Sequence, residues 1–335
     1  MKTILLEEPG KLRLTETPPP ENPSAGFALV RVHRVGVCGT DYHAFHGRQP
    51  FFSYPRIIGH ELGVEILAIN DPNKTSTLTV GDRCCVEPYL NCGKCISCRR
   101  GRGNCCMNMQ VMGVHVDGGM RERFVVPLHK LHRSAKLNYE QLALVETLGI
   151  GCHAVDRAQP IAGEPALVIG AGPIGLSVIP FLHAAGAKVI VADVSASRLE
   201  FCMTAMKVEK ILDASKDILP DLPELPTMVF DATGNPKSMM KAFDYVAPSG
   251  RLVFVGLFQG EVTFSDPLFH RREMTLLATR NSLPRDFEKI IKLVEDGVID
   301  TSPWITHRAA AAEILGVFPL WISPGAGVIK AVVEF

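Results

Sequence analysis

The sequence predicts an α/β chain of two domains, one an irregular and mostly antiparallel β domain and the other built on a doubly wound parallel sheet. The rhythm of the chain is the first observation behind this prediction. From Ile4 to Val126 short β-type runs are separated by turn residues, whereas from Ala166 onward strand-like and helix-like segments alternate. Length is the second observation, because 335 residues favour two domains at roughly 150 residues each.

The β domain is predicted from apolar runs bounded by turn residues. These runs lie at residues 28–35, 63–69, 83–87 and 123–126. After Pro284 we expect an amphipathic helix at 287–295, a short Ala-rich helix at 309–315 and a last strand near 328–333. The chain therefore returns to its first domain, which we place at residues 1–152 and 285–335.

The second domain, residues 153–284, is predicted from strands that alternate with helices. The expected strands are 166–169, 188–192, 228–232, 252–255 and 275–278. Three helices are expected: one that ends at Ala185, one at 197–206 and one at 237–246. The uncharged segment 165–182 contains three Gly and three Pro, so we expect strand, turn and helix there and no membrane span.

Composition limits the function classes. The balance of 35 Lys and Arg against 35 Asp and Glu disfavours nucleic acid and anionic membranes as partners. The amino-terminal segment has neither the basic start nor the apolar stretch of an export signal, so we expect a cytoplasmic protein. In a reducing compartment, ten cysteines with five of them between Cys92 and Cys106 indicate metal ligands rather than disulfides.

A glycine motif predicts a dinucleotide-binding (Rossmann) domain. Gly170, Gly172 and Gly175 form G-x-G-x-x-G directly after an apolar strand and directly before a helical pattern. These glycines allow a tight turn, the approach of a pyrophosphate and close packing of helix on strand. Asp193, at the end of the next strand, is placed to accept hydrogen bonds from ribose hydroxyls, which selects NAD. Arg198 nearby leaves NADP open.

A second motif predicts a structural zinc lobe at residues 90–107. Cys92, Cys95, Cys98 and Cys106 read C-x2-C-x2-C-x7-C within one polar loop, and four thiolates at such spacing can close a tetrahedral shell. Cys105 is an alternative fourth ligand. A zinc ribbon that contacts nucleic acid is the other interpretation, because basic residues share the loop, but the neutral chain and its dinucleotide motif disfavour it.

Several motifs in one order resemble the zinc-dependent medium-chain alcohol dehydrogenase family, in particular its sorbitol (polyol) dehydrogenase branch. Besides the cysteine lobe, they are V-G-V-C-G-T-D at 35–41, G-H-E at 59–61, G-D-R at 81–83, G-A-G-P-I-G at 170–175, D-V-S-A-S-R-L at 193–199 and T-H-R at 306–308. The resemblance runs through nearly the whole chain. It implies an oxidoreductase with one catalytic and one structural zinc per chain, working with NAD.

The resemblance implies a ligand set for the catalytic zinc. Cys38 and His60 match two protein ligands, and Glu146 matches the third, directly or through water. Glu61 matches a residue close to the zinc that can become a ligand when water leaves, so its place in the shell stays open. Without the resemblance, Glu146 could be an exposed or helix-capping carboxylate, but a lone charge in the apolar run 142–150 is costly.

The resemblance also implies a proton relay and further cofactor contacts. Thr40 matches the relay hydroxyl and His43 the base at its solvent end, with the nicotinamide ribose between them; alone, they could be a turn residue and a surface imidazole. The implied cofactor-binding residues are Gly170, Gly172, Pro173, Ile174, Gly175, Asp193, Arg198, Thr233, Gly234, Val255, Gly256, Leu257, Arg280 and Asn281.

The substrate is the least determined part. Relatives carry other residue types where this chain has Arg121 and Arg123, and two cations near a substrate cleft would attract a carboxylate. We therefore expect a secondary hydroxyl of a polyol, sugar or sugar acid to be oxidised, with Arg121 and Arg280 as candidate substrate contacts. Solvated surface arginines are the alternative. Other function classes are a zinc-free quinone or enone reductase and a non-enzymatic binding protein, and relatives imply a homodimer or homotetramer.

Overall fold

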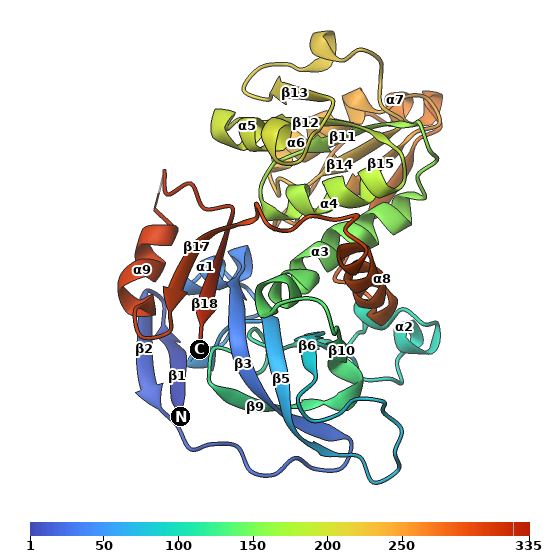
Figure 1. Cartoon of the computed structure of the whole chain (residues 1–335). Coiled ribbons are helices and arrows are strands. Elements are labelled where there is room, and N and C mark those ends of the chain that lie inside the picture. The colour runs from blue at the N-terminus through green and yellow to red at the C-terminus, as the bar shows by residue number, and fades with distance from the viewer. Residues whose placement is uncertain (324) are drawn as a thin grey trace. The chain divides into compact units, whose positions relative to one another are not determined.

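The computed structural model describes residues 1–323 and 325–335. The chain divides into two compact units: the first consists of Met1–Glu146 and Leu283–Phe335, and the second of Thr147–Ser282. Both chain ends lie in the first unit (Figure 1). The units change at 146/147 and 282/283, a few residues before the boundaries that we expected at 152/153 and 284/285.

The first unit is built around two long antiparallel strands, β3 (Phe27–Val37) and β5 (Glu61–Asn70). Side chains alternate across them, and Val30, Val32 and Val64 are fully buried in the core. Further strands extend this sheet in the order β10-β6-β5-β3-β18-β17, with β9 also paired to β3. They are β6 (Arg83–Val86), β9 (Arg123–Pro127), β10 (Leu131–Arg133), β17 (Ile305–Ala310) and β18 (Lys330–Glu334).

Smaller elements complete the first unit. A second sheet has the order β2-β1-β4, and β7 pairs with β8. These strands are β1 (Lys2–Glu8), β2 (Lys11–Glu16), β4 (Arg56–Ile57), β7 (Tyr89–Leu90) and β8 (Gln110–Val111). The helices are α1 (Gly39–Phe45), α2 (Ile96–Arg99), α8 (Pro284–Glu295) and α9 (Ile314–Trp321), and α3 (Tyr139–Ala158) begins here and continues into the second unit.

The second unit holds a parallel sheet in the order β13-β12-β11-β14-β15-β16. In chain order this is 3-2-1-4-5-6, the strand order of a Rossmann fold. The strands are β11 (Pro165–Ile169), β12 (Lys188–Asp193), β13 (Lys210–Asp213), β14 (Met228–Asp231), β15 (Arg251–Phe254) and β16 (Thr275–Ala278). The helices are α4 (Pro173–Ala184), α5 (Ala196–Thr204), α6 (Pro236–Tyr245) and α7 (Asp266–Arg271). The predicted fold class is confirmed.

Several segments differ from the expected elements, among them β13, which was not one of the expected strands. The helix expected at 309–315 is wrong, because Ala309 and Ala310 pair with Val333 and Glu334 as part of β17, and the helix starts only at Ile314. Pairing with β18 overrides the helix propensity of alanine there. The helix α3 was not delineated by the sequence pattern, since several consecutive residues inside it are buried and no helical periodicity shows.

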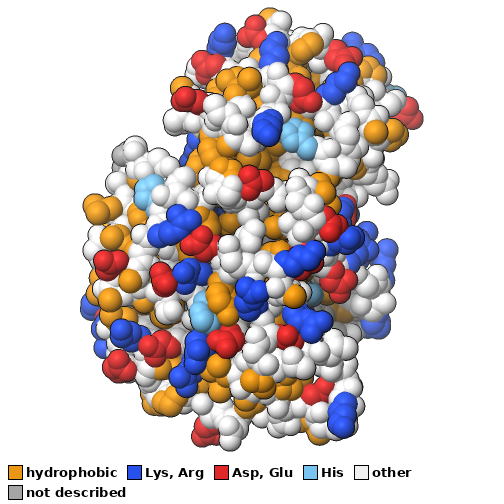
Figure 2. All heavy atoms as spheres, in the orientation of Figure 1, with side chains coloured by type: hydrophobic (Ala, Val, Ile, Leu, Met, Phe, Trp, Pro, Cys, Tyr) orange, Lys and Arg blue, Asp and Glu red, His pale blue; other side chains and the backbone are white. Residues whose placement is uncertain are grey.

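Surface and hydropathy fit the composition. Basic and acidic side chains are interspersed over the face shown in Figure 2, without a broad field of one sign. Among residues 1–323 and 325–335, no helix is both long enough and apolar enough to cross a membrane. The segment 165–182 forms β11, a turn and most of α4, as expected.

Candidate metal and cofactor sites

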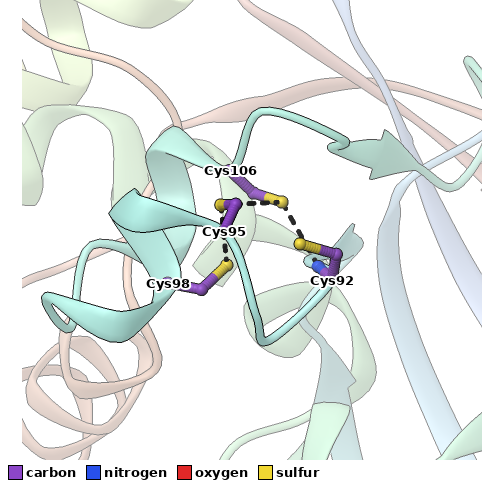
Figure 3. A group of neighbouring side chains, drawn as sticks. All are labelled: Cys92, Cys95, Cys98 and Cys106. Carbon is purple, nitrogen blue, oxygen red and sulfur yellow. Dashed lines mark hydrogen bonds between the residues drawn. The ribbon is translucent and has the colours of Figure 1, made fainter.

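Four predicted metal ligands converge in one short segment of the first unit, Cys92, Cys95, Cys98 and Cys106 (Figure 3). Their sulfur atoms all lie within 4.8 Å of one another, and Cys95 Sγ is 3.5 Å from Cys98 Sγ and 3.9 Å from Cys106 Sγ. A tetrahedral shell with zinc–sulfur bonds of about 2.3 Å has sulfur–sulfur edges of about 3.8 Å. The group therefore fits one zinc ion.

Hydrogen-bond donors lie around these sulfurs, and backbone N–H groups lower the pKa of Cys92, whereas burial raises the pKa of Cys106 to about 11. The backbone N–H of Cys92 donates to Cys106 Sγ at 3.2 Å, and the side-chain amide of Asn91 donates to Cys98 Sγ at 3.6 Å. Backbone N–H groups of Cys98 and Met107 lower the pKa of Cys95 to about 6. Cys105, the alternative fourth ligand, is exposed and lies outside the group.

A second group of donors forms where β3 and β5 meet. Cys38 follows β3 and caps α1, while His60 and Glu61 stand at the start of β5. Because Gly36 pairs with Glu61 in the antiparallel register, the donor atoms of Cys38, His60 and Glu61 come within 4.8 Å of one another. A thiol, an imidazole and a carboxylate form a donor set that zinc accepts, so the site fits a zinc ion.

Glu61 is held by a buried ion pair. Lys330 on β18, which also pairs with β3, donates to Glu61 Oε1 and Oε2 at 2.6 and 2.8 Å, and both side chains are at most 1% exposed. Burial alone would lower the pKa of Lys330, but the charges of Glu61 and Cys38 raise it. Gly36 leaves room for this carboxylate, because a Cβ there would lie 2.1 Å from Glu61 Oε2.

The carboxylate of Asp41 lies close to the His60 imidazole. Asp41, in the first turn of α1, accepts hydrogen bonds from the backbone N–H groups of Cys38 and Gly59, and its Oδ1 lies 3.9 Å from His60 Nδ1. Burial opposes the charged form of His60, but the charges of Cys38 and Asp41 raise its pKa well above the usual value. Negative groups thus surround the imidazole, an arrangement that a bound cation would satisfy.

Glu146 lies in α3 outside the close group, yet near enough for the charge of His60 to act on it. It is 5% exposed, so it is neither a surface carboxylate nor a helix cap. Burial raises the pKa of Glu146, while His60 and the hydroxyl of Tyr89 lower it. The Tyr89 hydroxyl donates to Glu146 Oε1.

The two relay candidates stand on one helix. Thr40 and His43 are three residues apart on α1, a spacing that places both on one face. Thr40 is half-buried and His43 is exposed. The order matches a path from a buried site to solvent.

In the second unit, the glycine motif forms the turn between β11 and α4. Gly170 has φ +96°, a conformation that favours glycine, and Gly172 caps α4. A Cβ on Gly175 would lie 1.7 Å from the carbonyl oxygen of Gly170, so only glycine fits at this packing contact. Pro173 and Ile174 form the first turn of the helix, and the backbone N–H groups at a helix start can bind an anion.

An acidic and a basic side chain flank this turn. Asp193, at the end of β12, accepts hydrogen bonds from the backbone N–H groups of Ala171 and Ser195 at 2.6 and 2.7 Å. A carboxylate has about four acceptor directions, so two stay available for ribose hydroxyls. Arg198 lies close by, since a Cβ on Gly172 would be 3.7 Å from its Nη1.

The other predicted cofactor residues gather at the carboxyl ends of the parallel strands. Thr233 and Gly234 follow β14, Val255, Gly256 and Leu257 follow β15, and Arg280 and Asn281 follow β16. A Cβ on Gly170 would lie 3.1 Å from Thr233 Cγ2, and one on Gly256 would lie 2.4 Å from the backbone nitrogen of Gly234. The loops after β11, β14 and β15 are therefore packed together, where a Rossmann sheet binds its ligand.

Two family models match the chain. The alcohol dehydrogenase GroES-like domain covers residues 24–136, and the zinc-binding dehydrogenase model covers residues 173–296. L-galactonate-5-dehydrogenase of Escherichia coli K12 is 37% identical over 340 residues, covering 100% of this chain and 99% of the relative. The chain belongs to the zinc-dependent medium-chain alcohol dehydrogenases. The expected family is thus confirmed, and the alternative of a non-enzymatic binding protein is excluded.

Other relatives of this dehydrogenase agree. D-altritol 5-dehydrogenase of Agrobacterium fabrum C58 is 32% identical over 326 residues and covers 95% of each chain. Among solved structures, the alcohol dehydrogenase RspB of Escherichia coli CFT073, solved with NADH, has a TM-score of 0.92 at 29% identity, covering 100% of this chain and 99% of that one. The similarity therefore spans the whole chain.

The two candidate substrate arginines of the dehydrogenase, Arg121 and Arg123, differ in burial. Arg121 is half-buried with its guanidinium 5.5 Å from the centre of the Phe124 ring, and burial lowers its pKa against the charge of Asp117. Arg123 is exposed and stands opposite Arg31 in the β3–β9 register. The solvated-surface interpretation thus holds for Arg123 but not for Arg121.

Sequence reasoning missed three residues of this centre: Asp41, Tyr89 and Lys330. Asp41 lies inside the quoted motif at 35–41, where the spacing to His60 gave no role. Lys330 is the single charged residue of the run 328–333, the same signal that drew attention to Glu146. Tyr89 gave no usable signal, because buried tyrosines are common.

Proposed function

We propose that this dehydrogenase oxidises a secondary hydroxyl of a polyol, sugar or sugar acid to the ketone and reduces NAD. The observation that carries the proposal is the group of Cys38, His60 and Glu61, whose imidazole and carboxylate are buried, in a chain whose second unit has the glycine turn of a dinucleotide site. A zinc-free quinone or enone reductase has no use for such a donor set. The names of the relatives support the substrate class.

In this proposal Cys38, His60 and Glu146 hold the catalytic zinc, and the four cysteines of the lobe hold a structural one, two ions per chain. When bound, the catalytic zinc supplies Lewis-acid polarisation of a substrate hydroxyl and lowers its pKa. Asp41 acts on the His60 imidazole through its charge, since its Oδ1 lies 3.9 Å from His60 Nδ1. Lys330 keeps Glu61 paired, so that Glu61 stands beside the site as a reserve ligand.

The proton of the substrate hydroxyl has an exit along α1. Thr40 takes part in the relay through its hydroxyl, which can accept one proton while it donates another. His43 releases the proton to solvent from its exposed position. Bound NAD would accept the hydride from the carbinol carbon, so that each turnover would yield one ketone, one NADH and one proton.

For the cofactor we propose NAD over NADP. The Asp193 carboxylate stands where the adenosine ribose binds in this fold, and it would repel a 2′-phosphate. Arg198 is the residue that would favour NADP. The ratio of kcat/KM for the two cofactors decides, and Asp193→Ala is expected to shift that ratio toward NADP.

For the substrate we favour a sugar acid, since L-galactonate-5-dehydrogenase is a relative by name. We keep Arg280, which follows β16 at the cofactor edge, and Arg121 as contacts for its carboxylate. If Arg121→Ala leaves KM for an aldonate unchanged while Arg280→Ala raises it, Arg121 has no part in binding. Faster turnover of polyols than of aldonates would refute the sugar-acid choice.

We further propose a cytoplasmic homodimer or homotetramer. Four thiolates in one lobe need a reducing compartment to stay available for metal. β16 is an edge strand with Leu276 exposed, a surface that a second copy could cover. Light scattering of the purified protein measures the oligomer directly.

One experiment tests the main proposal. The zinc-loaded protein with NAD is screened against polyols, sugars and aldonates while the absorbance of NADH is followed, with Cys38→Ser as the matched inactive control. Turnover of at least one secondary alcohol that is lost in Cys38→Ser supports the proposal. Reduction of quinones or enones by both proteins, without alcohol oxidation, contradicts it.

A further inference from the structure

We propose that Tyr89 is a positioning residue for Glu146, and that the four-cysteine lobe holds Tyr89 in place through the strand β7. This inference rests on the proposed function, in which Glu146 is a ligand of the catalytic zinc. It assigns a role to a side chain that no sequence motif marks, and it connects the structural metal site to the catalytic one.

The contact between Tyr89 and Glu146 is buried and directional. Tyr89 is 3% exposed and Glu146 is 5% exposed, and the tyrosine hydroxyl donates to Glu146 Oε1. A carboxylate in the middle of α3 has several rotamers, and a fixed donor on one of its oxygens selects among them. Such outer hydrogen bonds orient metal-binding carboxylates as they do histidines.

Tyr89 itself stands on a short strand that needs outside support. β7 contains only Tyr89 and Leu90, paired with Val111 and Gln110 of β8. The ring of Tyr89 packs edge-on against Phe287, with ring centres 6.4 Å apart. A two-residue pairing is weak alone, so the strand must be held by its ends.

Before Tyr89 the chain is held by a buried ionic cluster. Glu87 is 2% exposed; Lys130 Nζ donates to its Oε1, and His132 Nε2 lies 3.2 Å from its Oε2. Lys130 Nζ also donates to Asn91 Oδ1 at 3.2 Å, on the other side of Tyr89. The cluster therefore links the two ends of the strand.

After Tyr89 the chain enters the lobe at once. The Asn91 amide donates to Cys98 Sγ at 3.6 Å, and Cys92 is itself one of the four thiol donors. Only Leu90 and Asn91 stand between Tyr89 and this first lobe cysteine. A metal that closes the lobe thus fixes the end of β7 and with it the hydroxyl that holds Glu146.

The test replaces Tyr89 by Phe, which keeps the ring and removes the hydroxyl. Tyr54→Phe is the matched control, since the Tyr54 hydroxyl donates to the carbonyl of Ala44, away from Glu146. The readouts are zinc affinity of the catalytic site in competition with a chelator, the visible absorption bands of protein with cobalt(II) in that site, and kcat and KM separately.

We expect Tyr89→Phe to weaken metal binding at the catalytic site by roughly 10–100-fold, as loss of an outer partner does. Its cobalt bands should shift and kcat should fall, while KM for NAD stays unchanged. In a double-mutant cycle, Tyr89→Phe should add little to Glu146→Gln. Asn91→Ala, which keeps the hydroxyl but loosens its anchor, should act in the same direction by a smaller factor.

Other outcomes overturn the inference in distinguishable ways. Unchanged metal affinity and cobalt bands in Tyr89→Phe, or full additivity with Glu146→Gln, refute the positioning role and leave the proposed function intact. A normal Asn91→Ala protein refutes the anchoring by the lobe. Wild-type protein that binds no metal through Cys38 and His60 overturns both the inference and the proposed function.

Discussion

The four-cysteine lobe and the centre around Cys38 and His60 use opposite designs. The lobe takes all its donors from one short segment, and all four are thiols. The centre takes its donors from separate segments of the chain and mixes sulfur, nitrogen and oxygen. Its imidazole and its carboxylates are buried, and Lys330 compensates the charge of Glu61. A shell of four protein ligands has no open position, whereas a zinc held by three protein ligands would leave one for a substrate oxygen.

This contrast predicts that the two sites fail differently, and the largest effect is expected at the centre. His60→Ala should lower kcat/KM by more than the roughly 100-fold that loss of an outer partner costs, because a direct donor is removed. One zinc per chain should remain, in the lobe. Metal analysis alongside kinetics checks this, and a variant with two zinc ions and near-normal turnover would contradict the role of His60.

The lobe should instead fail through stability. Cys98→Ser removes one of the four donors, and structural zinc contributes folding free energy directly. We expect the melting temperature to fall by about 5–10 °C, at roughly 2–4 °C for each kcal/mol lost. Cys105→Ser is the control, since Cys105 is exposed and outside the group. If the Cys105 variant loses as much stability, Cys106 is not the fourth ligand.

The difference between local and scattered ligands also explains how much of the fold and of the two sites could be predicted from the sequence. The lobe follows from spacing, because its ligands are local, and the parallel sheet follows from alternation of strand and helix. The centre was recognised only through the family resemblance, since Cys38, His60 and Glu146 lie on separate elements. The pair of Lys330 with Glu61, 269 residues apart, depends on the register of β18 beside β3, which no local pattern encodes.

A third prediction concerns this long-range pair. Lys330→Met removes the ammonium group that pairs with the buried Glu61 carboxylate, and breaking such a pair costs about 3–5 kcal/mol. Denaturant unfolding should show that loss. Adding Glu61→Gln to Lys330→Met should recover much of it, because the uncompensated charge is gone. Equal stability of the single and double variants would show that the carboxylate does not need the lysine.

The smallest effects are expected from two glycine substitutions, which distinguish the cost of a left-handed backbone conformation from the cost of a steric clash. Gly93 in the lobe has φ +71°, and a Cβ added to it would meet no atom within 4 Å, so Gly93→Ala costs only the left-handed conformation, about 1 kcal/mol. Gly36 has no such φ, but its Cβ would lie 2.1 Å from Glu61 Oε2 and 2.9 Å from Glu61 Cβ. Overpacking of this kind costs about 1–3 kcal/mol.

Gly36→Ala should therefore lose more stability than Gly93→Ala, and it should also lower activity, because the carboxylate beside the catalytic centre must move. Gly93→Ala should keep full turnover, since the lobe thiols are not displaced. Unfolding curves and steady-state kinetics of the two variants give both quantities. Equal activity in the two variants would mean that the position of the Glu61 carboxylate does not affect the reaction. The lobe and the centre would then differ in function only because their metal-binding donor atoms differ.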